Sequence, residues 1–323
     1  MGATGAVGSE LLRVLERRNF PFASVRAFGS ARSAGKTVEF GNEAIPVEQL
    51  GPGWFDSVEL AFFSAGSEIS RQHAPAAQAA GTIVIDNSTA FRMDAHVPLV
   101  IPEINGNDVR NHQGIIANPN CTAAIALMAI YPLHRAFSVR RVIASSYQAV
   151  SGTGARAIAE LKQQIEAAAQ NQQPPPQVYP HPIAFNLLPH IGSFLPSGYT
   201  TEEEKLETEG RKIMHLPDFR ASATCVRVPV YRAHSVAVTA EFEREVSVEQ
   251  AQEVLAKAPG LELFDEPIHN RYPMPLNVAG RDNCQVGRIR RDSVFENGLS
   301  FWVCGDQLLK GAALNAVQIA ELL

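Results

Sequence analysis

The chain has 323 residues, of which 46% are hydrophobic and 19% are charged, and its formal net charge is -5 at pH 7. This length favours two domains that each bury a core, and the composition argues against a globally disordered chain. The mild negative charge provides no chain-wide attraction for phosphate backbones or anionic lipid, which disfavours a nucleic-acid or membrane-surface role. Small anionic ligands can still be held by local cationic clusters.

The four cysteines are spread along the chain without a C-x-x-C pair: Cys121, Cys225, Cys284 and Cys304. This spacing predicts neither a disulfide framework nor a metal site, and it favours a reducing, cytoplasmic compartment. The first residues lack the pattern of a signal peptide, and the longest apolar run, around residues 123–132, is too short to span a bilayer. We therefore expect a cytoplasmic protein without a membrane partner.

The chain begins with a glycine-rich segment, GATGAVG over residues 2–8, and Leu11, Leu12 and Leu15 then form a helical stripe. Glycines three residues apart allow a tight turn close to a pyrophosphate, and the following helix offers N–H groups and a positive dipole end. The alternative is a frayed glycine-rich tail. The pattern predicts a dinucleotide site with contacts from Gly2, Thr4, Gly5, Ala6, Val7 and Gly8.

A dinucleotide-binding turn normally follows a strand, and here only Met1 precedes it. We hypothesise that the native protein begins upstream and that Met1 is a valine start codon read as methionine. An intact mass of the native protein that began at Met1 or Gly2 would refute this.

Short apolar runs with helical stretches between them follow at residues 25–28, 59–64, 82–86 and 114–117. Near-continuous apolar strands that alternate with helices are typical of a parallel sheet covered on both faces. We therefore predict an α/β fold with a Rossmann-type, doubly wound parallel sheet in residues 1–121, the first strand of which is missing.

The pattern changes after Asn118. A long apolar helix over residues 122–137 leads into a strand at 139–150, and period-two alternation marks strands at 226–230, 236–242, 285–289 and 299–303. Strands with one solvent-exposed face predict an antiparallel or mixed sheet, in an α+β domain over residues 122–304. Residues 305–323 are expected to return to the first domain, and the polar, proline-rich residues 170–176 to form a surface linker.

The loop after the strand at 25–28 is where a sheet of this type reads the adenosine ribose. Ser30, Arg32 and Ser33 offer donors and positive charge suited to a 2′-phosphate, where an acidic residue would favour NAD. The loop predicts NADP as the cofactor, the alternative being a solvated surface loop.

Cys121 lies in the segment ANPNC, after a strand and a proline turn and at the start of an apolar helix. The positive end of the helix is expected to lower the pKa of the thiol and make it a nucleophile, and Asn120 can donate to an oxyanion beside it. The alternative is a buried small hydrophobe, which is how we interpret the three cysteines within strand patterns.

A nucleophilic cysteine needs a proton partner and groups that hold the substrate. His234 lies between two strands, where an imidazole that titrates near neutral pH can act as acid and base, and Arg227 offers a rigid fork for a carboxylate. Arg92, in a loop after the strand at 82–86, is a candidate anion binder. Each has an alternative as an ordinary core or surface residue.

Glu202 and Lys205 are three residues apart at the start of a predicted helix and share a face. They can meet an ammonium and an anion of one ligand, or they can form an ordinary ion pair with each other.

Together these motifs closely resemble the bacterial aspartate-semialdehyde dehydrogenases over nearly the whole chain. The matching segments are GATGAVG at Gly2, SARSAG at Ser30, DNSTAFR at Asp86, ANPNC at Ala117, SYQAVSGTGA at Ser146, RVPVYRAHS at Arg227 and GAALNAVQIAE at Gly311. The resemblance implies an NADP-dependent homodimer or dimer of dimers, with residues 122–304 as catalytic and dimerisation domain. It also implies the reversible reductive dephosphorylation of 4-phospho-L-aspartate to L-aspartate 4-semialdehyde, in lysine, methionine, threonine and isoleucine biosynthesis.

The resemblance also implies roles for single residues. Cys121 matches the nucleophile, His234 the acid/base, and Gln148 the residue that orients the acyl intermediate. Arg227 and Glu202 match the residues that bind the carboxylate and the amine of the substrate. Arg92 and Lys205 match the residues that bind the phosphate. Cofactor contacts match Ser151, Gly152, Gly154 and Gln307, where Gln307 replaces an asparagine found in many relatives.

Two alternatives are open on the sequence alone. One is a related acyl-phosphate reductase, such as an N-acetylglutamyl-phosphate reductase or a glyceraldehyde-phosphate dehydrogenase, although an acetylated amine would not need Glu202. The other is an inactive paralogue that serves only as a binding partner, against which the intact set of Cys121, Gln148, Arg227 and His234 argues.

Overall fold

The computed structural model describes residues 1–51, 53–172 and 174–323, so Gln173 of the expected linker lies outside the described residues. The chain divides into two compact units, the first made of Met1–Asn120 with Ala312–Leu323 and the second of Cys121–Gly311. Residues 305–311, which we expected in the first domain, therefore lie in the second. The reason is local, because Asp306 and Gln307 hydrogen-bond to Arg232 and Ala233 of that unit.

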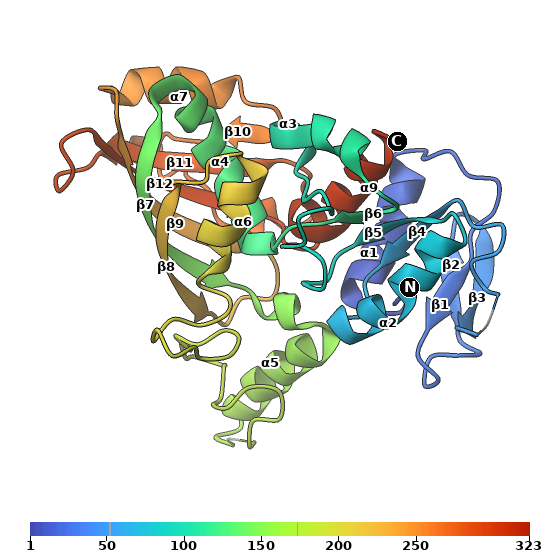
Figure 1. Cartoon of the computed structure of the whole chain (residues 1–323). Coiled ribbons are helices and arrows are strands. Elements are labelled where there is room, and N and C mark those ends of the chain that lie inside the picture. Colours follow the sequence, from blue (N-terminus) through green and yellow to red (C-terminus); the bar gives the residue numbers. More distant parts are fainter. Residues whose placement is uncertain (52, 173) are drawn as a thin grey trace. The chain divides into compact units, whose positions relative to one another are not determined.

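Parallel strands form the centre of the first unit, as the apolar runs predict. The sheet β4–β5–β6 has strands β4 (Leu60–Phe63), β5 (Ile83–Asp86) and β6 (Ile115–Ala117) in parallel register (Figure 1). Its helices are α1 (Ala6–Arg17), α2 (Ser67–Ala79), α3 (Pro102–Asn105), η1 (Gly106–Asn111) and α9 (Leu314–Ala320). The three leucines of the predicted stripe are buried on α1, which confirms that helix.

A second small sheet of this unit contains elements that the pattern did not predict. Strand β1 (Ala27–Gly29) was expected, but it pairs in parallel with β3 (Glu43–Gln49), which pairs antiparallel with β2 (Thr37–Phe40). Each new strand has only one buried residue, so both lack the apolar signal of the other strands.

Residues 1–3 hydrogen-bond to both of these sheets. The Met1 ammonium donates to the Phe62 carbonyl at 2.9 Å, and the amides of Gly2 and Ala3 donate to the Phe28 carbonyl at 2.8 and 3.1 Å. These residues thus take the position between β1 and β4 in which a strand before the glycine turn is expected. The upstream strand itself stays a hypothesis.

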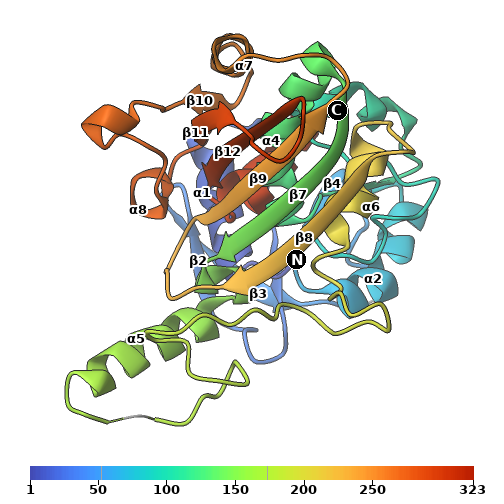
Figure 2. The same cartoon turned by 90° about the vertical axis from the view of Figure 1, so that its left-hand side faces the viewer.

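The second unit contains a six-stranded mixed sheet in the order β10-β11-β12-β9-β7-β8, which confirms the mixed sheet (Figure 2). The neighbours β7 and β8 are parallel, whereas β9 is antiparallel to both β7 and β12. Strand β8 ends at Arg227, so Val228 and Val230 follow the strand, which corrects the predicted range. The bounds are β7 (Val139–Gln148), β8 (Arg220–Arg227), β9 (His234–Phe242), β10 (Leu261–Leu263), β11 (Cys284–Arg291) and β12 (Gly298–Gly305).

Helix α4 (Cys121–Phe137) covers this sheet with an almost wholly apolar sequence and contacts β9 and β12. Among the described residues no helix combines the length and the hydropathy that a membrane crossing requires. The other helices of the unit are η2 (Val150–Thr153), α5 (Ala155–Ala168), α6 (Lys205–Ile213), α7 (Val248–Ala256), η3 (Pro267–His269), α8 (Pro275–Val278) and the π-helical η4 (Leu309–Ala313).

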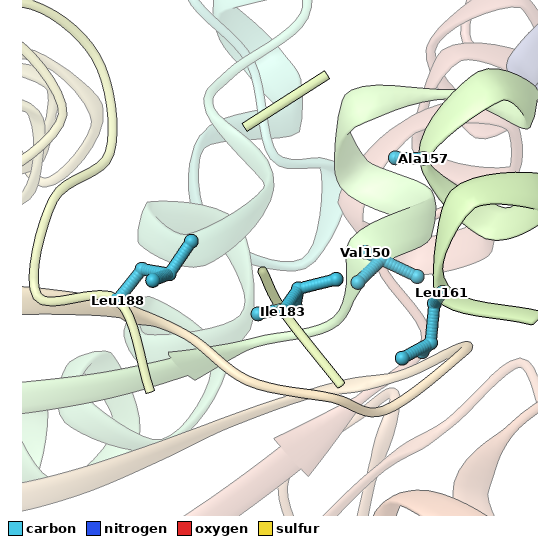
Figure 3. Packing of buried hydrophobic residues seen from close by; sticks show 5 residues of the cluster. All are labelled: Val150, Ala157, Leu161, Ile183 and Leu188. Carbon is cyan, nitrogen blue, oxygen red and sulfur yellow. The ribbon is translucent and has the colours of Figure 1, made fainter. Parts of the chain in front are cut away.

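A buried apolar cluster anchors the segment that follows β7. Val150 of η2 packs with residues of α5 and of the segment between α5 and α6 (Figure 3). Leu188 of this cluster also forms a backbone bridge with Arg227 at the end of β8. The cluster therefore holds η2 beside the ends of β7 and β8. Its members are Val150, Ala157, Leu161, Ile183 and Leu188.

Candidate functional site

Three strands of the second unit bring functional side chains to one edge of its sheet. Because β7 and β8 are parallel, their last residues Gln148 and Arg227 lie opposite each other. Strand β9 runs the other way, so its first residue His234 lies at the same edge and faces Gly305 of β12. This explains why residues 148, 227 and 234, far apart in sequence, meet in space.

A buried carboxylate organises the polar groups at this edge. The Gln148 Nε2 atom donates to Glu202 Oε1 at 3.1 Å, and the Lys205 ammonium donates to Glu202 Oε2 at 2.7 Å. Glu202 lies in the turn before α6 and Lys205 begins that helix. The two side chains meet as predicted, although Glu202 precedes the helix and does not lie on one of its faces. In the protein alone these two residues form the ion pair that we gave as the alternative.

His234 is completely buried, with 0% of its surface exposed. The Ala149 amide donates to its Nδ1 atom at 3.1 Å, so the neutral ring carries its proton on Nε2. Burial, and next the Arg227 charge, lower the pKa of His234 to about 3. The prediction of an imidazole that titrates near neutral pH is therefore wrong for this state, because burial disfavours the cation.

Arg227 is held beside His234 by the backbone of the segment that follows β7. Its Nη1 atom donates to the Ala149 carbonyl at 2.8 Å, while its Nε is a buried donor without a partner in the described part of the chain. A Cβ atom on Gly152 would lie 3.1 Å from Arg227 Nη1 and 3.2 Å from His234 Nε2. Glycine at this position therefore lets the η2 backbone approach both side chains.

Cys121 is the first residue of α4, as the sequence predicts. Burial, followed by the Glu202 charge, raises the pKa of its thiol, and Lys205 and Arg227 act in the opposite direction. The predicted lowering of this pKa is therefore wrong, because burial and Glu202 outweigh the two cations. A Cβ on Gly311 would lie 2.8 Å from the Cys121 Cβ, so η4 can pass this close to the cysteine only with glycine there.

The other three cysteines are buried in β8, β11 and β12, as expected. Burial raises the pKa of Cys225 and of Cys304 to about 12, which agrees with inert thiols. All four cysteines are free. In the described ranges no group of three or more His, Cys, Asp and Glu side chains is arranged to hold a metal ion.

The glycine turn of the first unit is tight and depends on its glycines. Gly2 has a φ of 76°, and a Cβ on Gly8 would lie 2.2 Å from the Gly2 carbonyl oxygen. Gly5 caps α1 without a side-chain hydrogen bond, which leaves this helix start open to an anion. The Thr4 hydroxyl donates to the Ser33 hydroxyl at 3.1 Å, so the turn and the loop with Ser30 and Arg32 adjoin.

Arg92 is a buried arginine of the first unit whose orientation is fixed by backbone carbonyls. Its Nε donates to the Asn118 carbonyl and its Nη2 to the Asn87 carbonyl, each at 2.9 Å. Asn120 is buried at the end of the same unit, directly before Cys121 in the chain.

Both ends of the Gln307 side-chain amide are hydrogen-bonded within the second unit. Its Oε1 accepts the Ala233 amide at 2.8 Å, and its Nε2 donates to the Ser151 hydroxyl. The residue before it, Asp306, is buried and accepts from Arg232 Nε at 2.6 Å. Sequence reasoning missed Asp306 and Arg232, although a carboxylate after an apolar strand is a signal that a buried partner exists.

Family models match both units. A model described as "Semialdehyde dehydrogenase, NAD binding domain" matches residues 1–112, and "Semialdehyde dehydrogenase, dimerisation domain" matches residues 130–310. The chain is 50% identical over 327 residues to the aspartate-semialdehyde dehydrogenase of Aquifex aeolicus, covering 100% of this chain and 96% of that protein. It is 49% identical over 323 residues to that of Synechocystis, with the same two shares.

A solved structure has the same fold. It is the crystal structure of aspartate semialdehyde dehydrogenase II from Vibrio cholerae, complexed with ASA. The TM-score is 0.97 and the identity 39%, over 100% of this chain and 96% of that one. The chain therefore belongs to the aspartate-semialdehyde dehydrogenase family.

Proposed function

We propose that this chain catalyses the reversible, NADPH-dependent reductive dephosphorylation of 4-phospho-L-aspartate to L-aspartate 4-semialdehyde. The product feeds the biosynthesis of lysine, methionine, threonine and isoleucine, and the enzyme works as a cytoplasmic homodimer. Family membership supports the reaction. The observation that carries it is the cluster at one sheet edge, where Gln148 and Lys205 both donate to Glu202. Arg227 and His234 both lie beside Gly152 at this edge, and the charges of Glu202, Lys205 and Arg227 act on the pKa of Cys121.

The substrate is recognised by the two buried charges at this edge. The planar Arg227 guanidinium binds the α-carboxylate, and Glu202 binds the α-ammonium. A free amino acid satisfies both groups, whereas an acetylated amine would offer Glu202 no cation beyond that of Lys205. This pair therefore favours aspartyl phosphate over an N-acetylated substrate.

The first chemical step transfers the acyl group to the enzyme. The Cys121 sulfur attacks the carbonyl carbon of the acyl phosphate: a C–S bond forms, the C–O bond to phosphate breaks, and the thiol proton passes to the departing phosphate. Phosphate leaves with the electron pair of that bond and is received by Arg92 and Lys205. Asn120 and backbone N–H groups stabilise the tetrahedral oxyanion, and Gln148 orients the resulting thioester.

The second step releases the aldehyde. NADPH, when bound, supplies the hydride that reduces the thioester. His234 offers its Nε2–H to the oxygen that gains negative charge, since Ala149 keeps Nδ1 as an acceptor. The oxyanion then re-forms the carbonyl as the C–S bond breaks, the aldehyde leaves, and the Cys121 thiolate takes a proton from solvent.

The glycine turn and its neighbouring loop fit NADP. Residues 2–8 form the turn and helix start for the pyrophosphate, and Ser30, Arg32 and Ser33 suit the 2′-phosphate. In the second unit, the backbone of Ser151, Gly152 and Gly154 lies beside the nicotinamide in this proposal.

The direct test measures NADPH formation from aspartate semialdehyde, phosphate and NADP. The wild-type protein should form NADPH only when phosphate is present. Cys121→Ala should abolish turnover and leave NADPH binding intact, measured by fluorescence titration. Absence of NADPH formation by folded wild-type protein would overturn the proposal, and a preference for N-acetylglutamate semialdehyde would favour the related reductase.

A further inference from the structure

Arg92 of the first unit takes its orientation from the backbone at two neighbouring strand ends. Its Nε donates to the Asn118 carbonyl and its Nη2 to the Asn87 carbonyl, each at 2.9 Å. Asn87 follows β5 and Asn118 follows β6, which are adjacent parallel strands. Because a guanidinium is planar, carbonyls on two of its nitrogens fix its plane. The direction of the other Arg92 donors therefore depends on where these two strand ends lie.

Three asparagine side chains join these strand ends to helix α9. Asn315 of α9 donates through Nδ2 to Asn118 Oδ1 at 2.7 Å, and Asn118 donates through Nδ2 to Asn87 Oδ1 at 2.8 Å. Asn118 Nδ2 also donates to the Ala312 carbonyl at 3.3 Å. Asn118 and Asn315 are 1% and 0% exposed, so water has no access to replace these bonds. We call Asn87, Asn118 and Asn315 the asparagine chain.

Backbone carbonyls at both ends fix the direction of the asparagine chain. Asn315 Nδ2 also donates to the Val100 carbonyl at 2.9 Å, and Asn87 Nδ2 donates to the Phe63 carbonyl at 3.3 Å. A carbonyl can only accept, so each of these two amides must turn its NH2 group toward its carbonyl. The amide between them, that of Asn118, then has only one orientation that satisfies both neighbours.

Asn315 contributes to this arrangement only as a donor. Its Oδ1 is a buried acceptor without a partner in the described part of the chain, and such an acceptor costs stability. Packing alone therefore does not explain the amide. Its contribution is the pair of donations to Asn118 and to Val100.

We propose that Asn315 is a positioning residue for Arg92, which it orients through Asn118. The proposal rests on the proposed function, in which Arg92 receives the phosphate group, and it gives helix α9 a role in the reaction. Without the Asn315 amide, Asn118 Oδ1 loses its buried donor, and the carbonyls that fix the guanidinium are free to shift. The affinity for phosphate should then fall, whereas the affinity for the other ligands should not.

The first experiment compares Asn315→Leu with the wild-type protein in the direction that consumes phosphate. Leucine has a similar size and removes both donations. We expect the KM for phosphate to rise by about 5- to 20-fold, which is part of the loss that removing a charge-assisted bond causes. The KM for aspartate semialdehyde and the Kd for NADPH should change by less than about 2-fold. A wild-type KM for phosphate would overturn the proposal.

The matched control is Asn105→Leu in the same unit. Asn105 is a buried asparagine whose Nδ2 donates to the Leu99 carbonyl at 2.8 Å and whose Oδ1 accepts the Ile101 amide at 2.9 Å. Its loss should disturb the segment that Asn315 contacts and leave the KM for phosphate unchanged. An equal rise in this KM in both variants would show a general effect of packing and overturn the proposal. If either leucine variant does not fold, Asn315→Ala and Asn105→Ala take their place.

A double-mutant cycle tests whether Asn315 acts through Arg92. Arg92→Lys keeps the charge and removes the planar fork. In that background, adding Asn315→Leu should raise the KM for phosphate no further, because the fork that Asn315 orients is absent. Multiplicative increases in the two variants would overturn the proposal.

A spectroscopic readout does not depend on turnover. The Arg92 Nε–H resonance, assigned by its loss in Arg92→Lys, reports the hydrogen bond to the Asn118 carbonyl. It should shift in Asn315→Leu and stay in place in Asn105→Leu, and an unchanged resonance in Asn315→Leu would overturn the positioning role. A wild-type KM for phosphate in Arg92→Lys would refute the phosphate role of Arg92 in the proposed function and leave this measurement valid.

Discussion

At the scale of single residues, burial sets the protonation states of the site. It raises the pKa of Cys121 and lowers that of His234, so both groups are neutral in the free protein. The sequence patterns predict a lowered pKa for Cys121 and a near-neutral pKa for His234, because a helix start and a strand junction say nothing about how deeply a side chain is enclosed. The resting pair is therefore a thiol and an imidazole.

Alkylation of Cys121 tests this directly. Since only the thiolate reacts, the rate with iodoacetamide in free enzyme should be low at neutral pH and still rise beyond the ordinary thiol pKa of 9.0. The rate is measured by mass spectrometry against pH, with Cys121→Ala as the control for other sites. A rate that levels off below this pKa would contradict the inferred state.

Arg227→Leu should mainly raise the KM for aspartate semialdehyde, because the carboxylate loses its partner. We expect an increase of roughly 10- to 100-fold, typical of a lost charge-assisted bond, measured by steady-state kinetics. Arg227→Lys should recover little, since an ammonium cannot reproduce the planar fork that also donates to the Ala149 carbonyl. Unchanged KM values in both variants would remove Arg227 from the substrate site.

At the scale of elements, the close approach of η2 to the strand ends decides the geometry of the site. The apolar runs of the first unit and the long helix before β7 are predictable from their own sequences. The approach of η2 is not, because it depends on the cluster around Val150 and on the missing side chain at Gly152. These contacts join residues that are distant in the chain.

Gly152→Ala should lower kcat by roughly 10-fold or more with little loss of stability. The new Cβ must displace either Arg227 Nη1 or the His234 ring, each within 3.2 Å. The φ of Gly152 lies outside the positive range, so the alanine backbone is unstrained and the unfolded chain loses entropy. Kinetics and thermal unfolding are compared, and a variant with wild-type kcat would show that the ring adapts freely.

At the scale of the whole molecule, the buried histidine links stability to pH. Its pKa is about 3 in the folded protein, whereas the ordinary pKa of a histidine is 6.5. Between the two pKa values the unfolded chain binds a proton at this histidine that the folded chain does not. The free energy of unfolding is therefore undiminished above the ordinary pKa and falls as the pH is lowered through this window. The slope is about 1.4 kcal/mol per pH unit in this window.

Wild-type protein should therefore lose about 2 kcal/mol more than His234→Gln between roughly pH 6.5 and pH 5. Chemical denaturation of both proteins at several pH values measures the difference in unfolding free energy. Parallel pH dependences would show that His234 is protonated in the folded protein, contrary to the inferred state.

The sequence by itself determined the two sheet types, the helix that begins at Cys121, the glycine turn and the family of the chain. These follow from hydrophobic periodicity and from motifs whose residues are neighbours in the chain. Only the tertiary structure revealed the β2–β3 hairpin, the tautomer of His234 and the raised pKa of Cys121. It also revealed the hydrogen bonds of Asp306 and Gln307 to residues 232–233. The reason is physical, because burial and hydrogen-bond partners arise from segments that meet only when parallel β7 and β8, antiparallel β9 and the end of β12 share one edge.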